Sequence, residues 1–345
     1  MKTKFKFLIV MIKIAINGLG RIGRAALKIA FERPDLEIVG VNDLAPIPDT
    51  AYLLKYDSVY GIWDHEVKPT EKEIIIDGKI LPYSQEPAPE KLLWQQLGAE
   101  IVLECTGVFT KSEKAGKHLE AGAKLVILSA PPKSDDIKIL LMGCNEKEFN
   151  FERHKIISNA SCTTNCLAPV MKVLNDEFGI EQALMTTIHS YTASQSLVDS
   201  PVKERRESRA AALNIIPSTT GAAIAVTKVL PELEGRFHGM AVRVPSPIVS
   251  ASDLTAKLRQ KVSAEKINNA FIAAAQGPLK GILGVTSEEL VSTDFKKDPR
   301  SSIVDLSLTM VLGEDLVKVF AWYDNEWGYS ERLIDLAEFT GGKIS

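Results

Sequence analysis

Two patterns of hydrophobic and polar residues divide the chain near position 160. In the first part, short and almost continuously apolar runs alternate with amphipathic segments, a pattern typical of buried parallel strands separated by helices. The expected strands are Met11–Ile16, Ile38–Asn42, Ile101–Glu104 and Leu125–Leu128, and the expected helices are Arg21–Phe31, Pro89–Leu97 and Ser112–Ala121. This alternation predicts a doubly wound α/β fold of the Rossmann type.

The second part has longer elements in a different order. A helix is predicted over Cys162–Phe178 and a strand over Ala183–Ile188, followed by the long polar segment His189–Pro217. Such a loop inside a compact region is typical of a functional segment or an interface. The remaining expected elements are the strands Met240–Val244, Ile248–Leu254, Val304–Met310 and Val317–Trp322 and the helices Ala264–Ala275 and Tyr329–Glu338. Together they predict an α+β region with a largely antiparallel sheet.

Composition excludes several classes of protein. The 345 residues include 41 Lys and Arg against 44 Asp and Glu, for a net charge of −3, which does not favour nucleic acid or an anionic membrane as the main partner. Four cysteines are too few for a disulfide framework, so we expect a cytoplasmic protein with reduced thiols.

Residues 1–16 begin like a signal peptide, with lysines followed by apolar residues. They lack a small-residue cleavage site before Asn17, and the apolar run is broken by Lys13. We therefore interpret residues 1–10 as an extension that precedes the first buried strand.

Three glycines form a GxGxxG turn between the first strand and the first helix. Gly18, Gly20 and Gly23 are placed to allow a tight turn, close approach of a pyrophosphate and close helix–strand contact. Asp43, twenty residues beyond Gly23, ends the next strand, where its carboxylate can bind the ribose of NAD and repel the extra phosphate of NADP. The pattern predicts dinucleotide binding; the alternative is a glycine turn used only for helix packing.

A cysteine lies at the predicted start of the helix that follows residue 161. Asn159 or Ser161 can cap this helix, so the Cys162 thiol would lie at the positive end of its dipole and have a lowered pKa. There are two alternatives to a reactive thiol. Cys162 could be an ordinary packed or surface cysteine, or it could form a redox or metal-binding pair with Cys166. No second Cys/His cluster at metal-ligand spacing accompanies this pair, so we predict no metal site.

Among the five histidines, His189 is the best candidate for a base that acts on this thiol. It follows a strongly apolar strand and opens the long loop, a common location for a catalytic side chain on a rigid support. His118 and His154 are surrounded by charged residues in the sequence and are expected to face solvent.

Taken together, these residues closely resemble the phosphorylating glyceraldehyde-3-phosphate dehydrogenases of type I, from about Ile12 to Leu336. The matching segments are Ile16–Arg24, Val41–Asp43, Lys55–Ser58, Cys105–Thr110, Ser158–Pro169, Thr186–Thr192, Asn214–Ala223, Met240–Pro245 and Trp322–Tyr329. Residues 158–166, Ser-Asn-Ala-Ser-Cys-Thr-Thr-Asn-Cys, are the most specific of these.

The resemblance implies an organisation for the whole chain. It implies an NAD-binding domain at residues 11–160, completed by a C-terminal helix at 326–345, and a catalytic and tetramerisation domain at 161–325. It further implies a homotetramer, with the segment His189–Pro217 near subunit contacts and neighbouring cofactors.

The resemblance also implies a role for each matching residue. Cys162 would be the nucleophile that forms a hemithioacetal and then a thioester with glyceraldehyde 3-phosphate, and His189 its base. The implied cofactor contacts are Asn17, Gly18, Gly20, Arg21, Ile22, Gly23, Asp43, Ser129 and Asn325. Thr192 and Arg243 would bind the phosphate of the substrate, and Ser161, Thr163, Arg206, Thr220 and Gly221 would bind the attacking inorganic phosphate.

Three positions depart from the common pattern of these enzymes. Pro87 stands where a basic residue is common, Ile224 replaces a usual lysine, and Ser200-Pro201 stands where NAD-specific bacterial relatives often carry Leu-Pro. NAD preference is predicted from Asp43 and Pro201, while Ser200 leaves use of NADP open. The alternative functions are erythrose-4-phosphate dehydrogenase, which releases an acid without using phosphate, and a non-catalytic nucleotide- or RNA-binding protein.

Overall fold

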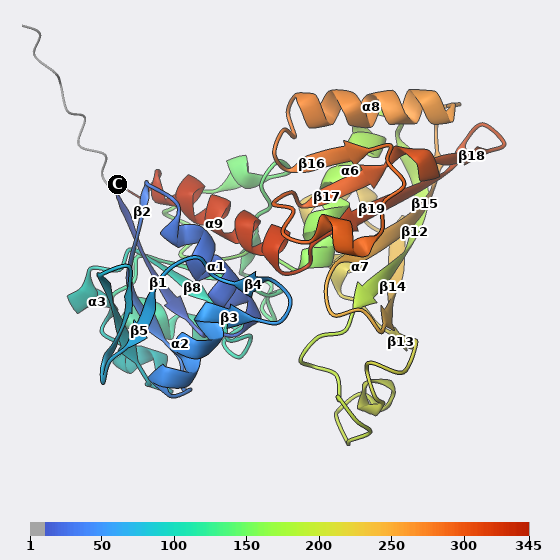
Figure 1. Cartoon of the computed structure of the whole chain (residues 1–345). Coiled ribbons are helices and arrows are strands. Elements are labelled where there is room, and N and C mark those ends of the chain that lie inside the picture. The colour runs from blue at the N-terminus through green and yellow to red at the C-terminus, as the bar shows by residue number, and fades with distance from the viewer. Residues whose placement is uncertain (1–10, 345) are drawn as a thin grey trace, which may run out of the picture.

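The first sheet is built around the strand that precedes the glycine turn. In the computed structural model, which describes residues 11–344, this sheet has the order β10-β11-β9-β8-β1-β2-β7-β6-β5 (Figure 1). Its strands are β1 (Ile12–Asn17), β2 (Leu36–Asn42), β5 (Val67–Pro69), β6 (Glu73–Ile76), β7 (Lys79–Ser84), β8 (Ile101–Glu104), β9 (Leu125–Leu128), β10 (Lys138–Ile139) and β11 (Ile156–Ser158). Strands β1, β2, β8 and β9 pair in parallel, which confirms the doubly wound prediction.

The helices of this part are α1 (Arg21–Phe31), α2 (Ile47–Lys55), α3 (Trp94–Leu97), α4 (Ser112–Ala115) and α5 (Lys117–Glu120). The prediction of one helix over Pro89–Leu97 was wrong: a 3₁₀ turn covers Pro89–Lys91, and Leu92 is extended. This break buries both Leu92 and Trp94 in the core, so tertiary packing overrides the helical spacing. The helix expected over Ser112–Ala121 is divided at Gly116, a residue of low helix propensity.

The second sheet is mixed but largely antiparallel, as expected. It has the order β13-β14-β12-β15-β19-β17-β16, and β18 pairs with β19. Its strands are β12 (Ile180–Ser190), β13 (Ile216–Ser218), β14 (Phe237–Val244), β15 (Ser250–Leu258), β16 (Leu283–Thr286), β17 (Ser302–Asp305), β18 (Met310–Leu312) and β19 (Leu316–Tyr323). A separate two-stranded ribbon is formed by β3 (Tyr56–Asp57) and β4 (Gly61–Ile62). Neighbours β12 and β14, and β16 and β17, are parallel.

The expected strand Val304–Met310 was wrong because the chain turns after Asp305. The Asp305 carboxylate accepts hydrogen bonds from the Ser307 amide at 3.2 Å and its hydroxyl at 2.6 Å, and a 3₁₀ turn follows over Leu306–Leu308. The remaining helices are α6 (Cys162–Phe178), α7 (Ala222–Val229), α8 (Ala264–Gln276) and α9 (Trp327–Gly341), of which α7 was not predicted.

The C-terminal helix α9 connects the two parts of the molecule. It leaves the second sheet after β19 and runs back alongside α1 (Figure 1). Leu333 and Ile334 are fully buried in the same hydrophobic cluster as Ile14 of β1, and a Cβ added at Gly341 would lie 2.6 Å from the Ile12 side chain. Helix α9 therefore packs into the core of the first sheet. None of the helices among residues 11–344 has the length and apolar character that a membrane crossing requires.

Candidate active site

The glycine turn has the strained, crowded backbone that its sequence predicts. Gly18 has φ +94°, a conformation that disfavours any side chain, and a Cβ at Gly23 would lie 1.9 Å from the Gly18 carbonyl oxygen. A Cβ at Gly20 would meet no atom within 4 Å, so space remains above the turn. No side chain caps the amino end of α1, which leaves backbone N–H groups at the positive end of the helix dipole for an anionic group.

Asp43 lies in the wall of a cavity of about 450 Å³ beside this turn. Its carboxylate accepts hydrogen bonds from the Leu19 amide at 2.6 Å and the Ala45 amide at 2.9 Å, which fix its position between the turn and the next loop. The cavity is lined by Asn17, Gly18, Gly20, Asn42, Asp43, Leu44, Glu86, Pro87, Pro89, Cys105, Thr106, Val108 and Phe109. The open turn, the uncapped helix and this cavity suit a dinucleotide.

Two predicted cofactor residues have side chains engaged inside the protein. The Arg21 guanidinium binds Glu326, with Nε 2.9 Å from Oε2, and Asp57, with Nη1 2.5 Å from Oδ2. Burial opposes the charge of Arg21, but these two carboxylates hold its pKa above the ordinary value. Asn17 is buried and donates from Nδ2 to Glu104 at 2.6 Å. Arg21 is therefore placed to contribute its backbone at the turn, while its side chain joins α1 to the start of α9.

Cys162 is the first residue of α6, as the sequence predicted. The Ser161 hydroxyl caps this helix by accepting a hydrogen bond from the Thr164 amide at 3.2 Å. The preceding residue, Ala160, has φ +52°, and its carbonyl accepts a hydrogen bond from Tyr329 of α9 at 2.9 Å. The tight turn before the cysteine is thus held partly by the C-terminal helix, a role of Tyr329 that no local sequence signal indicates.

The predicted nucleophile and base are in contact. Cys162 Sγ lies 3.5 Å from His189 Nε2. His189 Nδ1 lies 2.7 Å from the carbonyl oxygen of Ser190, which only accepts, and beside the Arg243 guanidinium, which only donates, so Nδ1 can satisfy one of these two partners while Nε2 faces the thiol. Arg243 Nη1 lies 2.6 Å from Nδ1 and donates to the same carbonyl at 3.1 Å.

Burial changes the electrostatics that the sequence predicted for Cys162. Desolvation raises the pKa of the thiol, although Arg243 and the amides of Cys162 and Thr163 at the helix terminus lower it. The predicted lowering was therefore wrong in direction, since the loss of hydration outweighs the helix terminus. Burial and the charge of Arg243 also lower the pKa of His189, to about 3. Both partners are therefore held neutral, and the lowered pKa makes the imidazole a weak base in the unliganded protein.

Of the residues predicted to bind phosphate, Arg243 contacts this pair directly, and the others lie on several separate elements. Thr163 is buried, and its hydroxyl lies 3.1 Å from the Tyr323 hydroxyl. Thr192 lies just beyond the end of β12, while Thr220 and Gly221 precede α7 and Arg206 is exposed in a 3₁₀ turn. Buried Arg243 Nε has no hydrogen-bond partner among the described residues, so it is a donor that an anion can satisfy.

The carboxamide of Asn325 lies buried at the end of β19, 4% exposed. Ser129 follows β9, and its amide donates to the Glu104 carbonyl at 3.0 Å. Cys166, one turn into α6, is fully buried beside Ser302, which excludes the alternative that it pairs with Cys162 at the surface. All four cysteines are free thiols.

The expectation for His118 was wrong. This residue is fully buried: Trp94 Nε1 donates to its Nδ1 at 3.0 Å, and its Nε2 donates to Glu104 at 3.0 Å. The charged residues beside it in the sequence project from other faces of the short helix α5.

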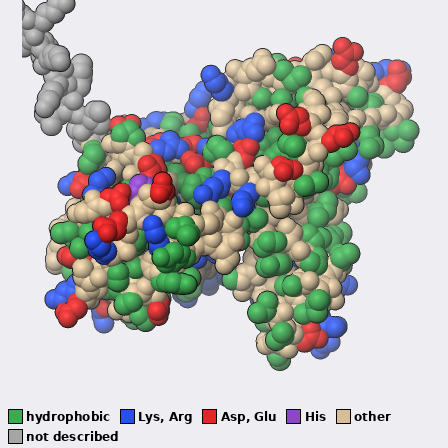
Figure 2. Space-filling view, in the orientation of Figure 1, with side chains coloured by type: hydrophobic (Ala, Val, Ile, Leu, Met, Phe, Trp, Pro, Cys, Tyr) green, Lys and Arg blue, Asp and Glu red, His purple; other side chains and the backbone are tan. Residues whose placement is uncertain are grey.

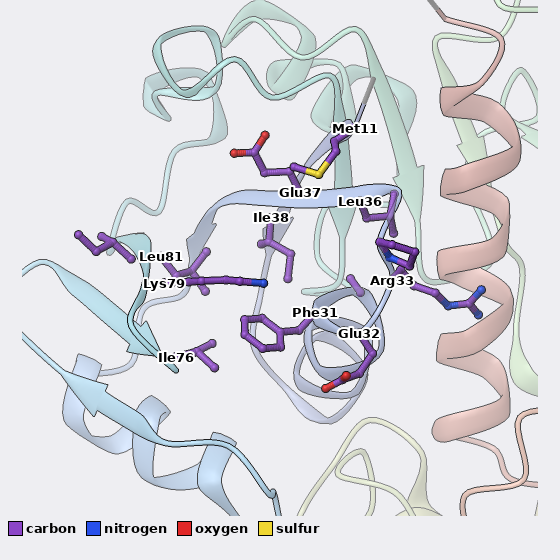
Figure 3. Close-up of a pocket in the computed structure, with 13 residues that line it drawn as sticks. Met11, Phe31, Glu32, Arg33, Leu36, Glu37, Ile38, Ile76, Lys79 and Leu81 are labelled. Carbon is purple, nitrogen blue, oxygen red and sulfur yellow. The ribbon is translucent and has the colours of Figure 1, made fainter. Parts of the chain in front are cut away.

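A second cavity, of about 420 Å³, opens at the amino ends of β1 and β2 (Figure 3). Phe31, Ile38, Lys79 and Leu81 line it, and Lys79 Nζ lies 4.5 Å from the centre of the Phe31 ring. It contains none of the predicted site residues and lies at the strand ends opposite to the glycine turn. It is therefore separate from the candidate active site.

Comparison with known proteins agrees with this geometry. Residues 12–112 match the family described as glyceraldehyde 3-phosphate dehydrogenase, NAD binding domain, and residues 161–325 match glyceraldehyde 3-phosphate dehydrogenase, C-terminal domain. The chain is 52% identical over 332 residues to glyceraldehyde-3-phosphate dehydrogenase of Geobacillus stearothermophilus and 53% identical to glyceraldehyde-3-phosphate dehydrogenase 1 of Bacillus subtilis strain 168, covering 96% of this chain and 99% of each relative. It is 52% identical to the chloroplastic glyceraldehyde-3-phosphate dehydrogenase B of Pisum sativum, covering 96% of this chain and 74% of that one.

These matches span both sheets and include the Cys162–His189 pair and the glycine turn. The predicted resemblance is confirmed, and NAD is the cofactor of the matched first domain. The chain belongs to the glyceraldehyde-3-phosphate dehydrogenase family.

Proposed function

We propose that the protein oxidises glyceraldehyde 3-phosphate with NAD and inorganic phosphate, forming 1,3-bisphosphoglycerate. The observation that carries this proposal is the 3.5 Å contact between Cys162 Sγ and His189 Nε2 at the amino end of α6. A thiol adds to an aldehyde when a neighbouring base takes its proton, and this pair supplies both groups. The names of the curated relatives support the same substrate.

In the first step, Cys162 sulfur bonds to the aldehyde carbon and its proton passes to His189. The amides of Cys162 and Thr163 at the start of α6 face the sulfur and can stabilise negative charge there. His189 returns this proton to the aldehyde oxygen, which completes the hemithioacetal, and takes it back when the carbon loses its hydride, so that a thioester remains on Cys162; the bound NAD would supply the hydride acceptor. Attack by inorganic phosphate breaks the carbon–sulfur bond, gives the acyl phosphate and releases the cysteine.

Arg243 couples substrate binding to the basicity of His189. Its positive charge is one of the two causes that lower the pKa of His189, the larger being burial. A phosphate bound to Arg243 would offset this charge and make the imidazole a better base once substrate is present. The unpartnered Arg243 Nε supports an anion site here, with Thr192 as its second member.

The attacking phosphate is assigned to Ser161, Thr163, Thr220, Gly221 and Arg206. Ser161 and Thr163 are residues of the amino end of α6, and Thr220 and Gly221 precede α7, so both sets offer backbone amides at helix starts. The exposed Arg206 adds a charged donor at a separate loop.

NAD would be held by the glycine turn, the amino end of α1 and Asp43, with Ser129 and Asn325 nearer to Cys162. When bound, it supplies the acceptor for the hydride of the aldehyde. The hydrogen-bonded Asp43 carboxylate supports preference for NAD, because a 2′-phosphate beside it would meet a like charge.

We further propose a cytoplasmic homotetramer. Exposed apolar side chains gather on the part of the molecule formed by the second sheet and its long loop (Figure 2). They include Leu184, Leu197, Val198, Leu213, Ile215 and Ile224, which are each at least 67% exposed. Such a surface is typical of subunit contacts, and light scattering measures the assembly directly.

One assay tests the proposed reaction. Formation of reduced cofactor is followed at fixed glyceraldehyde 3-phosphate while phosphate is varied and NAD is exchanged for NADP. We expect turnover to require phosphate and to be faster with NAD. Phosphate-independent turnover, with erythrose 4-phosphate as the better aldehyde, would reject the proposal in favour of the related dehydrogenase.

A further inference from the structure

Two serine hydroxyls hold the carboxamide of Asn325 in one orientation. Ser190 Oγ donates to Asn325 Oδ1 at 2.9 Å, and Ser250 Oγ donates to the same oxygen at 3.1 Å. The Ser190 amide in turn donates to Ser250 Oγ at 3.0 Å, and for the single Ser250 hydroxyl proton Asn325 Oδ1 at 3.1 Å is a nearer acceptor than Ser190 Oγ at 3.4 Å. All three side chains are at most 4% exposed, so these hydrogen bonds are shielded from water.

Two of these residues come from different strands and the third from the turn after another strand, and they meet at the ends of three neighbouring inner strands of the second sheet. Ser190 is the last residue of β12 and Ser250 is the first residue of β15, which pairs antiparallel with both β12 and β19. Asn325 follows the end of β19 by two residues. The cluster therefore exists only when the register of three strands is correct.

This arrangement determines which side of the Asn325 amide points away from the cluster. With Oδ1 occupied by two donors, the Nδ2 group has no hydrogen-bond partner among the described residues. An N–H donor held in a fixed direction can recognise a carboxamide oxygen such as that of the nicotinamide ring. If the amide could rotate, acceptor and donor would exchange places and the recognition would be lost.

Ser190 also contacts the catalytic base, but through its main chain. Its carbonyl oxygen lies 2.7 Å from His189 Nδ1 and 3.1 Å from Arg243 Nη1. A change of the Ser190 side chain leaves this carbonyl in place. The two roles of the residue can therefore be separated by mutation.

We propose that Ser190, assisted by Ser250, is a positioning residue that orients Asn325 toward the nicotinamide carboxamide, so that one residue aligns both the base and the cofactor ring. This inference rests on the role that the proposed function gives to Asn325. The Ser190 hydroxyl touches neither substrate nor the reacting sulfur in this assignment, because it acts through the amide of Asn325.

The test is a double-mutant cycle read by equilibrium binding of NAD to the purified full-length protein, measured by calorimetry. S190A should weaken NAD binding about tenfold, or about 1.4 kcal/mol, and S250A about threefold. N325A should weaken binding at least as much as S190A. Because Ser190 acts through Asn325, adding S190A to N325A should cause almost no further loss. Equal losses from S190A in the presence and absence of Asn325 would overturn the proposal.

A matched control separates positioning from general damage to the sheet. Ser252 lies two residues along β15, is 1% exposed, and its hydroxyl makes no hydrogen bond to the site and lies near Cys166 instead. S252A should leave NAD affinity unchanged, and loss of affinity there would count against the proposal. If S190A does not fold, S250A is tested in the same cycle.

A second readout follows His189 independently of the cofactor. The pH profile for alkylation of Cys162 by iodoacetamide should be the same in wild type and S190A, because the Ser190 carbonyl remains. A shifted profile would show that the side chain acts on the base and would overturn the assignment. Turnover of glyceraldehyde 3-phosphate by the wild-type protein tests the proposed function separately, because the double-mutant cycle measures NAD binding and requires no turnover.

Discussion

The two halves of the candidate active site are built in different ways. The dinucleotide side is made mainly of backbone: the crowded Gly18 and Gly23 and the uncapped amino end of α1 are close together in sequence. The catalytic side is made of side chains from four separate elements, with Cys162 on α6, His189 on β12, Arg243 on β14 and Asn325 after β19. The first half therefore depends on local sterics and the second on strand register.

This comparison predicts that each half can be damaged without the other. Loss of the Cys162 or His189 side chain should remove chemistry and leave cofactor binding intact. A change in the glycine turn should remove cofactor binding while the Cys162–His189 contact remains.

The largest effect is expected for C162S. Serine is a much weaker nucleophile than a cysteine paired with a base, so turnover should fall by about 10⁴-fold or more. Affinity for NAD, measured by calorimetry, should change less than about twofold, because the substitution is nearly isosteric. Turnover within about tenfold of wild type would reject Cys162 as the nucleophile.

H189N should lower turnover by about 10³-fold, within the range for loss of a general base. It should also slow alkylation of Cys162, because the neighbouring acceptor for the thiol proton is lost. Steady-state rates and iodoacetamide kinetics measure the two effects on the same preparation. An unchanged alkylation rate would show that the 3.5 Å contact does not activate the sulfur.

The glycine turn is tested by comparing G23A with G20A. The Cβ of G23A would lie 1.9 Å from the Gly18 carbonyl oxygen, so we expect the free energy of unfolding to fall by about 1–3 kcal/mol and NAD affinity to fall at least tenfold. G20A has no atom within 4 Å of the new Cβ and should keep the wild-type melting temperature while still weakening NAD binding. Unchanged affinity in G20A would place the pyrophosphate elsewhere.

The smallest effect concerns His65, which lies in the bend between β4 and β5 and is not one of the predicted site residues. Its Nε2 is 2.6 Å from Glu32 and its Nδ1 is 2.6 Å from Asp77. Burial opposes protonation, but the combined hydrogen bonds and charges of Asp77 and Glu32 outweigh it and raise the pKa of His65 above its ordinary value. The resulting stabilisation is complete below the unfolded-state pKa of about 6.5 and is lost as pH rises through the raised folded-state pKa.

H65Q removes this titration. The difference in melting temperature between wild type and H65Q should therefore be larger at about pH 6 than at about pH 9, with no change in NAD affinity at either pH. A difference that grows with pH would contradict the assigned charge state.

The sequence by itself determined the features that arise from neighbouring residues. Short segments of sequence were enough to predict the GxGxxG turn, Asp43 after β2 and Cys162 at the start of α6. Glycine sterics and helix capping act over only a few residues, so each signal is local. The alternating apolar runs also predicted the first sheet, since parallel strands are buried on both faces.

Tertiary structure alone decided how distant residues combine. The burial of His118 and the break before Trp94 result from packing partners far along the chain, whereas the turn after Asp305 is made by hydrogen bonds from its near neighbour Ser307. The pKa of Cys162 was predicted in the wrong direction because desolvation depends on the whole fold, whereas the helix terminus is a local feature. The contacts of Tyr329 with the catalytic turn and of Ser190 with Asn325 likewise require α9 and three strands in register, and no short segment of sequence contains that information.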